Sequence, residues 1–179
     1  MIYLSCADTA KLIRTALKES FPGVKFTVQS RVYAGGASID VAYTNGPTYD
    51  QVKTVTSMFV GAYFDSLTDY RGSVYNSLDG EEVRFAANYV FISRKFSKMV
   101  LEILVDASCK YYGYATPAIV DSGFGAQISD QVDYETNRRM MDSVGKASAC
   151  ETHYSPTLAR VAFLGDDGYG SGCVGRLAA

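Results

Sequence analysis

Residues 33–43 read Tyr33-Ala-Gly-Gly-Ala-Ser-Ile-Asp-Val-Ala-Tyr43, and they follow another alternating run at residues 25–30. One face of the second run carries Ala37, Ile39, Val41 and Tyr43. Its other face carries Ser38, Asp40 and Ala42. Two runs with a period of two residues, separated by a Gly-Gly pair, predict an antiparallel hairpin that buries one face.

The hairpin contains the first candidate binding residues. Gly35 and Gly36 supply the positive φ that a tight turn or bulge needs, although such a pair also lets a phosphate or another backbone come close. The turn is favoured, because no helix follows directly to present its N-terminus to an anion. Ser38 and Asp40 are either solvated strand residues or the polar floor of a binding surface, and the solvated position is favoured.

Two helices are predicted to flank the hairpin. One runs over residues 9–21 from a cap at Ser5 or Asp8, and the other begins at a Thr48–Gln51 capping box. The polar side of the first helix carries Lys11, Arg14 and Lys18. A basic helix face can contact phosphates. A solvated face is favoured, because every amphipathic helix needs a charged side.

A long strand over residues 82–93 comes next, followed by a helix from an N-cap at Ser93 to about Lys110. Its first turn is predicted to hold a second basic cluster of Arg94, Lys95 and Lys98. Cations are electrostatically unfavourable at a helix N-terminus. This placement makes the cluster a candidate binding feature, with ordinary solvated side chains as the alternative.

The order helix-strand-strand-helix-strand-helix predicts an α+β fold, with an antiparallel sheet and helices packed on one of its faces. Residues 1–110 are expected to form this module. Residues 111–179 are expected to be an extension that packs on it in the same globule. The extension should contain a helix over residues 131–144, a strand over residues 158–164 and a Gly/Asp-rich loop or tail over residues 165–172.

The composition excludes several classes of protein. The net charge of −2 argues against nucleic-acid binding by bulk charge but leaves room for a local basic patch. The four cysteines lack the C-x-x-C spacing of a zinc site, and Ser122-Gly-Phe-Gly125 lacks the spacing of a dinucleotide fingerprint. Neither a metal nor a cofactor is expected. The N-terminus lacks the features of a signal peptide, and no apolar run approaches the about 20 residues of a membrane span, so no membrane partner is expected.

Two groups of residues raise the question of catalysis. Asp65, Asp69 and Arg71 resemble a metal or acid–base cluster, but their spacing matches no metal motif and exposed loop carboxylates are commoner. Cys150 and His153 suggest a Cys–His nucleophile. Nearness in sequence does not establish that geometry, since such partners usually meet only in the fold. No catalytic residue is assigned.

Several short segments carry a resemblance to a known family. They are Ala10-Lys-Leu-Ile-Arg14, Phe21-Pro-Gly-Val-Lys-Phe26, Tyr33-Ala-Gly-Gly-Ala-Ser-Ile-Asp40, Gly46-Pro47 and Phe64-Asp65. Together they resemble the large polyvalent protein-associated domain 29 of phage and plasmid proteins, over about residues 7–95. The resemblance implies an accessory protein of a mobile genetic element that acts in a bacterial cytoplasm. It implies no catalytic residues.

These observations leave three hypotheses for the function. The first is a non-enzymatic protein that binds a host protein or nucleoprotein complex through Gly35–Asp40 and the second basic cluster. Such binding would serve counter-defence, for example anti-CRISPR inhibition or inhibition of a restriction enzyme. The second is a nucleic-acid-binding module that uses the basic helix face and the second basic cluster to protect or process incoming DNA. The third is a small enzyme of unknown reaction.

Overall fold

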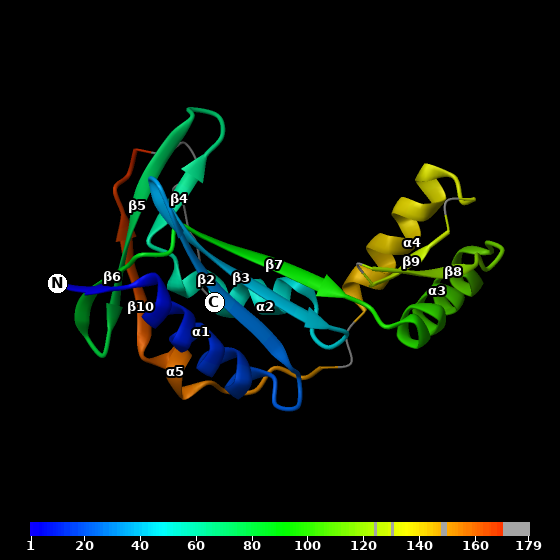
Figure 1. The fold of residues 1–179 in the computed structure, drawn as a ribbon, viewed down its shortest axis with the longest axis horizontal. Helices are drawn as coiled ribbons and strands as arrows, with labels where there is room; N and C mark the ends of the chain where they lie inside the picture. The colour runs from blue at the N-terminus through cyan, green and yellow to red at the C-terminus, as the bar shows by residue number, and fades with distance from the viewer. Residues whose placement is uncertain (124, 130, 148–149, 170–179) are drawn as a thin grey trace.

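The chain contains both helices and strands in mixed and antiparallel sheets, and the fold belongs to the α+β class, as predicted. The structure is a computed structural model that describes residues 1–179 except 124, 130, 148–149 and 170–179. In chain order its elements (Figure 1) are β1 (Ile2–Leu4), α1 (Cys6–Ser20), β2 (Phe26–Tyr33), β3 (Gly36–Thr44), α2 (Tyr49–Thr56), the 3-10 helix η1 (Ser57–Phe59), β4 (Ala62–Asp65), β5 (Tyr70–Leu78), β6 (Glu81–Phe85), β7 (Tyr89–Lys95), α3 (Lys98–Tyr112), β8 (Ile119–Ser122), β9 (Gly125–Ile128), α4 (Tyr134–Lys146), α5 (Pro156–Ala159) and β10 (Val161–Asp166).

The predicted hairpin is confirmed as β2 and β3, which pair antiparallel from Phe26↔Tyr43 to Tyr33↔Gly36. Gly35 has a φ of +88°, a left-handed backbone conformation that tight turns require and that glycine adopts most easily. β7 then joins the other side of β3, and it runs parallel to it, so this sheet is mixed rather than purely antiparallel. β3 is therefore the central strand, with neighbours on both sides.

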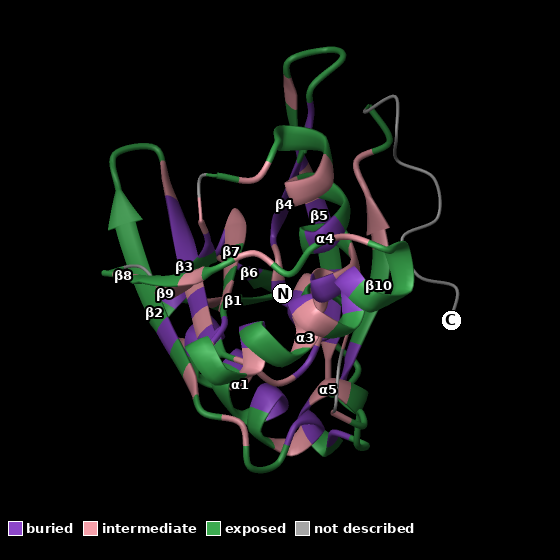
Figure 2. Cartoon of the chain, turned by 90° about the vertical axis from the view of Figure 1, so that its right-hand side faces the viewer, coloured by how far each residue is buried: buried purple, intermediate pink, exposed green. Residues whose placement is uncertain are grey.

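Helices α1 and α2 cover one face of the β2–β3–β7 sheet. The side chain of Ser5 caps α1 by accepting a hydrogen bond from the backbone N–H of Asp8, and the predicted capping box opens α2 at Thr48. The core between the helices and the sheet contains Ile13, Leu17, Ile39, Val41, Val52 and Val55. Purple segments on α1 and β3 in Figure 2 mark part of this core. Burial of each such side chain stabilises the fold by about 1.5–3 kcal/mol.

The prediction of one continuous strand over residues 82–93 is wrong. It is two strands in two sheets, because the chain crosses from β6 to β7 at residues 86–88. Backbone hydrogen bonds fix this crossing: the N–H of Ala86 donates to Leu4 O, and the N–H of Asn88 donates to Ala37 O. The two bonds tie the crossing to β1 on one side and to β3 on the other.

The second sheet has the order β1–β6–β5–β10, with β4 also paired to β5. The sequence pattern predicts a loop around Asp65, Asp69 and Arg71 and a polar, turn-rich segment at residues 76–82. Residues 66–69 and 79–80 are turns, but the rest of these two segments belongs to β4, β5 and β6, so most of the turn-rich prediction is wrong. β5 is polar in sequence, yet it buries Asn76 and Ser77, and the Asn76 side-chain amide donates to Val60 O over 3.1 Å. Asp65 is likewise buried rather than exposed in a loop. Hydrogen-bonded polar residues inside the fold hide the alternation that marks a strand.

A separate hydrophobic cluster is built from α3, β8, β9 and α4. Its buried residues include Leu101, Val105, Ile128, Met140 and Val144. These elements lie together at one end of the molecule, away from the β1–β6–β5–β10 sheet (Figure 1). The expected domain boundary at residue 110 falls within α3, so this helix packs with the extension rather than with the hairpin. The division into a module and an extension stays a prediction.

The chain then returns to the first core through α5 and β10. β10 pairs antiparallel with β5, so the strand predicted over residues 158–164 is confirmed from Val161 onward, whereas residues 158–159 belong to α5. Asp167 follows it and accepts hydrogen bonds from Tyr63 Oη, Tyr70 Oη and the backbone N–H of Ser73 over 2.6, 3.0 and 2.7 Å. The first part of the expected Gly/Asp-rich tail is thus held in place, while residues 170–172 lie outside the described part.

Glu19 fastens the returning segment to α1. Its carboxylate accepts hydrogen bonds from Ser155 Oγ, Thr157 N and Thr157 Oγ1 over 2.6, 2.9 and 3.0 Å. These bonds, that from Ser155 first, lower the pKa of Glu19 from its ordinary value of 4.5. Because the folded pKa lies below the unfolded one, the carboxylate stabilises the fold above about pH 5, and this stabilisation is lost as pH falls through the folded pKa.

We therefore expect Glu19→Gln to lower the free energy of unfolding by about 1 kcal/mol near neutral pH, because the amide cannot accept all three bonds. Denaturant unfolding at neutral pH and at about pH 3 measures the difference, which should shrink in acid. Glu102→Gln, on the exposed side of α3, is the control and should change little. A loss of equal size at both pH values would show that the charge of Glu19 is not responsible.

Candidate functional site

The face of the β2–β3–β7 sheet opposite α1 and α2 is called the open face here. Strand register aligns Arg31, Ser38 and Tyr89 in one row across it. The next row holds Gln29, Asp40 and Phe91. Successive side chains in a strand point to opposite faces, and in these rows Gln29, Arg31 and Phe91 are exposed.

Aromatic side chains are exposed on the open face. Tyr89 and Phe91 stack with a centroid separation of 6.0 Å and an interplanar angle of 22°. Phe91 is 56% exposed, and Tyr33, at the hairpin end of β2, is 48% exposed. These rings lie beside the polar side chains of Gln29 and Arg31 on the same face.

The structure revises the predicted environment of Ser38 and Asp40. Ser38 is only 5% exposed, so the solvated position is wrong for it, and it forms part of the floor of the open face between Arg31 and Tyr89. Asp40 is half-buried and pairs with Arg31, whose Nε lies 2.6 Å from Asp40 Oδ2. This pair neutralises the carboxylate on the face. Binding through these residues stays a prediction.

The hairpin tip, at one end of the open face, adjoins a hollow called here the hairpin cleft, with a volume of about 750 Å³. Its lining includes Tyr33 and Gly36 from the open-face side of the hairpin, but Val32, Ala37 and Cys6 from the side that α1 covers, so most of the cleft lies behind the tip. The hairpin tip lines it together with β1, β5 and β6. Its cations are Arg71 and Arg84, and the described residues of its lining include neither Asp nor Glu. Arg71 Nη1 donates to Gly35 O over 3.0 Å, and Arg84 lies beside Tyr3 in the parallel β1–β6 pair. The cleft is therefore electropositive and partly aromatic.

Gly35 and Gly36 meet this cleft for different physical reasons. A side chain at Gly35 would have open space, so its glycine serves the positive φ of the turn. A Cβ at Gly36 would lie 2.4 Å from Asn88 Nδ2 and 3.2 Å from the Tyr33 ring. A larger residue at this position would force the Asn88 amide, at the end of a flexible side chain, to move.

The other end of the open face leads into a second hollow, called here the lysine cleft, with a volume of about 710 Å³. Thr27, Ala42 and Thr44 bring the open face into it, and Lys25 and Lys95 supply its charge. In the described part of the chain, its lining also contains neither Asp nor Glu. The lysine cleft therefore borders the open face directly, whereas the hairpin cleft lies around the hairpin tip.

The first predicted basic cluster lies elsewhere. Lys11, Arg14 and Lys18 are on α1, which packs against the opposite face of the sheet. Lys11 pairs with Asp8 over 2.8 Å, and Arg14 Nη2 donates to Val28 O over 2.8 Å. Lys18 is exposed. The structure therefore does not bring these cations onto the open face.

The second predicted cluster is divided between two elements. Arg94 and Lys95 belong to β7, and Ser97 rather than Ser93 occupies the N-cap position of α3, so the predicted helix start is wrong. The backbone N–H of Ser97 donates to Asn45 Oδ1, and this bond positions the start of α3. Lys95 and Lys98 are exposed, and only Lys95 lines the lysine cleft.

Arg94 is held by structural contacts. Its guanidinium donates to Gly46 O, Gly145 O and Ala147 O over 2.7, 3.0 and 2.9 Å. It also stacks over the Phe96 ring at 4.6 Å, and burial lowers its pKa. Two of the three carbonyls lie at the C-terminal end of α4, where a cation is favourable. Arg94 therefore joins the β2–β3–β7 sheet to the separate hydrophobic cluster of α3, β8, β9 and α4.

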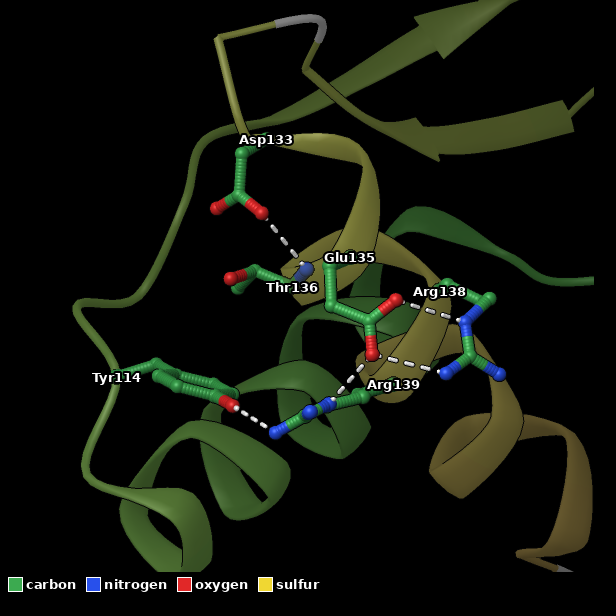
Figure 3. A network of polar contacts seen from close by, with 6 residues as sticks. All are labelled: Tyr114, Asp133, Glu135, Thr136, Arg138 and Arg139. Carbon is green, nitrogen blue, oxygen red and sulfur yellow. Dashed lines mark hydrogen bonds and ion pairs between the residues drawn. The ribbon is translucent and has the colours of Figure 1, made fainter.

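Other cations are neutralised within α4, as Figure 3 shows. Arg138 and Arg139 both donate to the carboxylate of Glu135, and Arg139 also donates to Tyr114 Oη. These bonds lower the pKa of Glu135 to about 2. The charged face of α4 is thus paired internally, unlike the lining of the two clefts.

Asp65, Asp69 and Arg71 do not form a metal cluster. Within the described ranges, no group of three or more His, Cys, Asp or Glu side chains could hold a metal ion. Asp65 accepts a hydrogen bond from Leu67 N in the β4–β5 turn, and Arg71 lines the hairpin cleft. The described helices also include none that is long and apolar enough to cross a membrane.

Tyr89, Phe91 and Arg84 were missed as candidate site residues. Tyr89 and Phe91 alternate with Val90 and Ile92, so the sequence offers two possible buried faces for β7. Val90 and Ile92 pack against the core, which leaves the two rings on the open face. The crossing at residues 86–88 decides this choice. The two-residue spacing of Tyr89 and Phe91 shows that both rings share one face of the strand, but it does not show whether that face is buried or exposed.

Comparison with known families adds an identification. A family model described as large polyvalent protein associated domain 29 matches residues 4–97, slightly more than half of the chain. The chain belongs to this family. The match runs from the end of β1 to the N-cap position of α3, so it includes the whole open face.

Membership of the domain 29 family associates the chain with the polyvalent proteins of phages and other mobile elements. Neither the curated proteins nor the solved structures contain a match to it. The hydrophobic cluster of α3, β8, β9 and α4, together with α5 and β10, follows residue 97 and so lies outside the matched segment.

Proposed function

We propose that this chain is a non-enzymatic accessory protein of a mobile genetic element, and that it binds a host macromolecule through the open face. The observation that carries the proposal is the stacked Tyr89–Phe91 pair, because Phe91 is more than half exposed on a sheet face that no described helix covers. Such a surface loses apolar area to a partner on binding. The open face also lies entirely within the family segment.

Counter-defence is the biological role that we propose for this binding. The family is associated with polyvalent proteins of mobile elements, which meet host defences on entering a cell. A CRISPR effector or a restriction complex in the bacterial cytoplasm is the proposed partner. Inhibition by occupation needs a contact surface and no catalytic group, which agrees with the aromatic character of the open face.

A second candidate function is nucleic-acid binding. One observation favours it: the described linings of the lysine cleft on the open face and of the hairpin cleft around the hairpin tip contain cations and no carboxylates. The helix face proposed from the sequence has a weaker basis, because Asp8 pairs with Lys11 and the backbone holds Arg14.

A pull-down from bacterial lysate with active defence systems tests the proposed function. We expect the wild-type chain to retain a macromolecule that Phe91→Ser no longer retains, because a polar residue removes the exposed ring. Phe163→Ser is the matched control: this ring on β10 is 38% exposed and lies on the other sheet. Equal recovery with all three proteins would contradict a role for the open face.

A further inference from the structure

We propose that the open face, the lysine cleft and the hairpin cleft bind a single-stranded nucleic acid, with bases on the aromatic rings and the backbone over the cleft cations. The inference rests on the binding surface of the proposed function and deepens its second candidate, nucleic-acid binding, by naming the class of nucleic acid. Three features of the described residues support it: the ring arrangement, the placement of charge and the pairing of Asp40.

The rings offer a stacking surface for unpaired bases. Tyr89 and Phe91 lie on β7 two residues apart, and they form a near-parallel pair with Phe91 open to solvent. Tyr33 lies on the same face at the hairpin end of β2. Aromatic side chains on a sheet stack successive bases, and they do so without requiring one sequence, because every base has a π-face.

Charges lie near both ends of the open face: the lysine cleft is on that face, and a bound nucleic-acid strand reaches the hairpin cleft by passing Tyr33 and Gly36 around the hairpin tip. Arg71 and Arg84 line the hairpin cleft at one end, and Lys25 and Lys95 line the lysine cleft at the other. Neither lining, as far as the structure describes it, contains a carboxylate to oppose a phosphate. The net charge of −2 is therefore unevenly distributed, with paired charges on α4 and electropositive hollows beside the open face.

The central carboxylate of the open face does not repel a polyanion strongly. Arg31 pairs with Asp40 over 2.6 Å, so this row is close to neutral while Arg31 keeps donors at its exposed end. The surface fits unpaired bases better than a duplex, because base pairing hides the base faces that the rings would stack on. A protein partner is the competing outcome of the test.

The test is fluorescence anisotropy with a labelled single-stranded DNA of about 16 nucleotides, its RNA counterpart and the matching duplex. We expect the single strands to bind more tightly than the duplex. Affinity should fall with salt at a slope of about −3, because each neutralised phosphate contributes about −0.7 and four cations flank the face.

Two variants and two controls locate the binding. Phe91→Ser should weaken single-strand binding by about 10-fold or more through lost stacking. Arg84→Ser should weaken it and make the salt dependence less steep by about 0.7. Phe163→Ser and Lys18→Ser are the matched controls for ring and charge, and they should bind like wild type. Circular dichroism and thermal unfolding of each variant exclude loss of fold as the cause.

Three results would overturn the inference. These are preferential duplex binding, loss of affinity in Lys18→Ser with none in Arg84→Ser, and no binding of either single strand at low salt. In the last case, a lysate protein that survives nuclease and is lost with Phe91→Ser would leave the proposed function intact with a protein partner. Recovery that is insensitive to Phe91 would remove the proposed function as well.

Discussion

Gly61→Ala is expected to lower the free energy of unfolding by about 3 kcal/mol, because the new methyl group has no room. A Cβ built on Gly61 would lie 1.9 Å from the backbone oxygen of Phe85. That oxygen cannot move away easily. The N–H of Gly61 donates to Ala87 O, and the N–H of Ala86 donates to Leu4 O, so both sides of the contact are fixed by the crossing between the sheets.

Denaturant unfolding of Gly61→Ala measures this loss, and Gly145→Ala provides the matched control. Gly145 lies in α4, and a Cβ added there would meet nothing within 4 Å among the described residues. Alanine there should raise stability by up to about 1 kcal/mol through its helix propensity. If Gly61→Ala proved as stable as wild type, the described packing of β6 against residue 61 would be wrong.

Arg94→Ala is expected to produce the second large effect. It removes a guanidinium that holds three backbone carbonyls from two parts of the chain, and it also removes the contact with the Phe96 ring. Hydrogen bonds to charged groups contribute about 1.5–3 kcal/mol each in favourable cases. Because Arg94 is only partly buried, we expect a total loss of about 2–3 kcal/mol.

The loss of stability should be concentrated where the β2–β3–β7 sheet meets the hydrophobic cluster of α3, β8, β9 and α4. Limited proteolysis should cut residues 112–134 or 146–152 of Arg94→Ala faster than those of wild type. Arg94→Lys should restore only part of the stability, since an ammonium lacks the fork that reaches several carbonyls. Lys98→Ala, an exposed neighbour, is the control. Unchanged proteolysis in Arg94→Ala would show that this residue does not join the two parts.

The elements that depend on residues close together in sequence, namely the β2–β3 hairpin and the starts of α1 and α2, could be predicted from the sequence. Period-two runs around Gly35 indicated the β2–β3 hairpin, and capping residues indicated the starts of α1 and α2. These signals are local, because a turn and a helix cap depend on residues only a few positions apart. The α+β class followed from the order of the elements.

The remaining elements depend on contacts between distant residues. β5 was missed because its buried positions include Asn76 and Ser77, whose polarity resembles that of a loop. The break between β6 and β7 depends on Gly61, more than 20 residues earlier in the chain. The sequence around residue 87 contains no pattern that indicates this contact with Gly61.

The candidate site was only partly predictable for the same reason. Gly35 and Gly36 were recognised because glycine pairs have few roles, and they do line the hairpin cleft. The local sequence indicates a free cation at Arg94, because the carbonyls of Gly145 and Ala147 that hold it come from a helix some 50 residues away. The alternation alone is equally typical of a core position for Phe91, and only the placement of the helices on the opposite face exposes its ring.

The most direct test of binding through the open face is an NMR titration of the labelled full-length chain with the single-stranded oligonucleotide. We predict that resonances of Tyr33, Tyr89 and Phe91 shift together, followed by those of Arg71, Arg84, Lys25 and Lys95 in the two clefts. Changes confined to Lys11, Arg14 and Lys18 on α1, or no change at saturating oligonucleotide, would contradict binding through the open face.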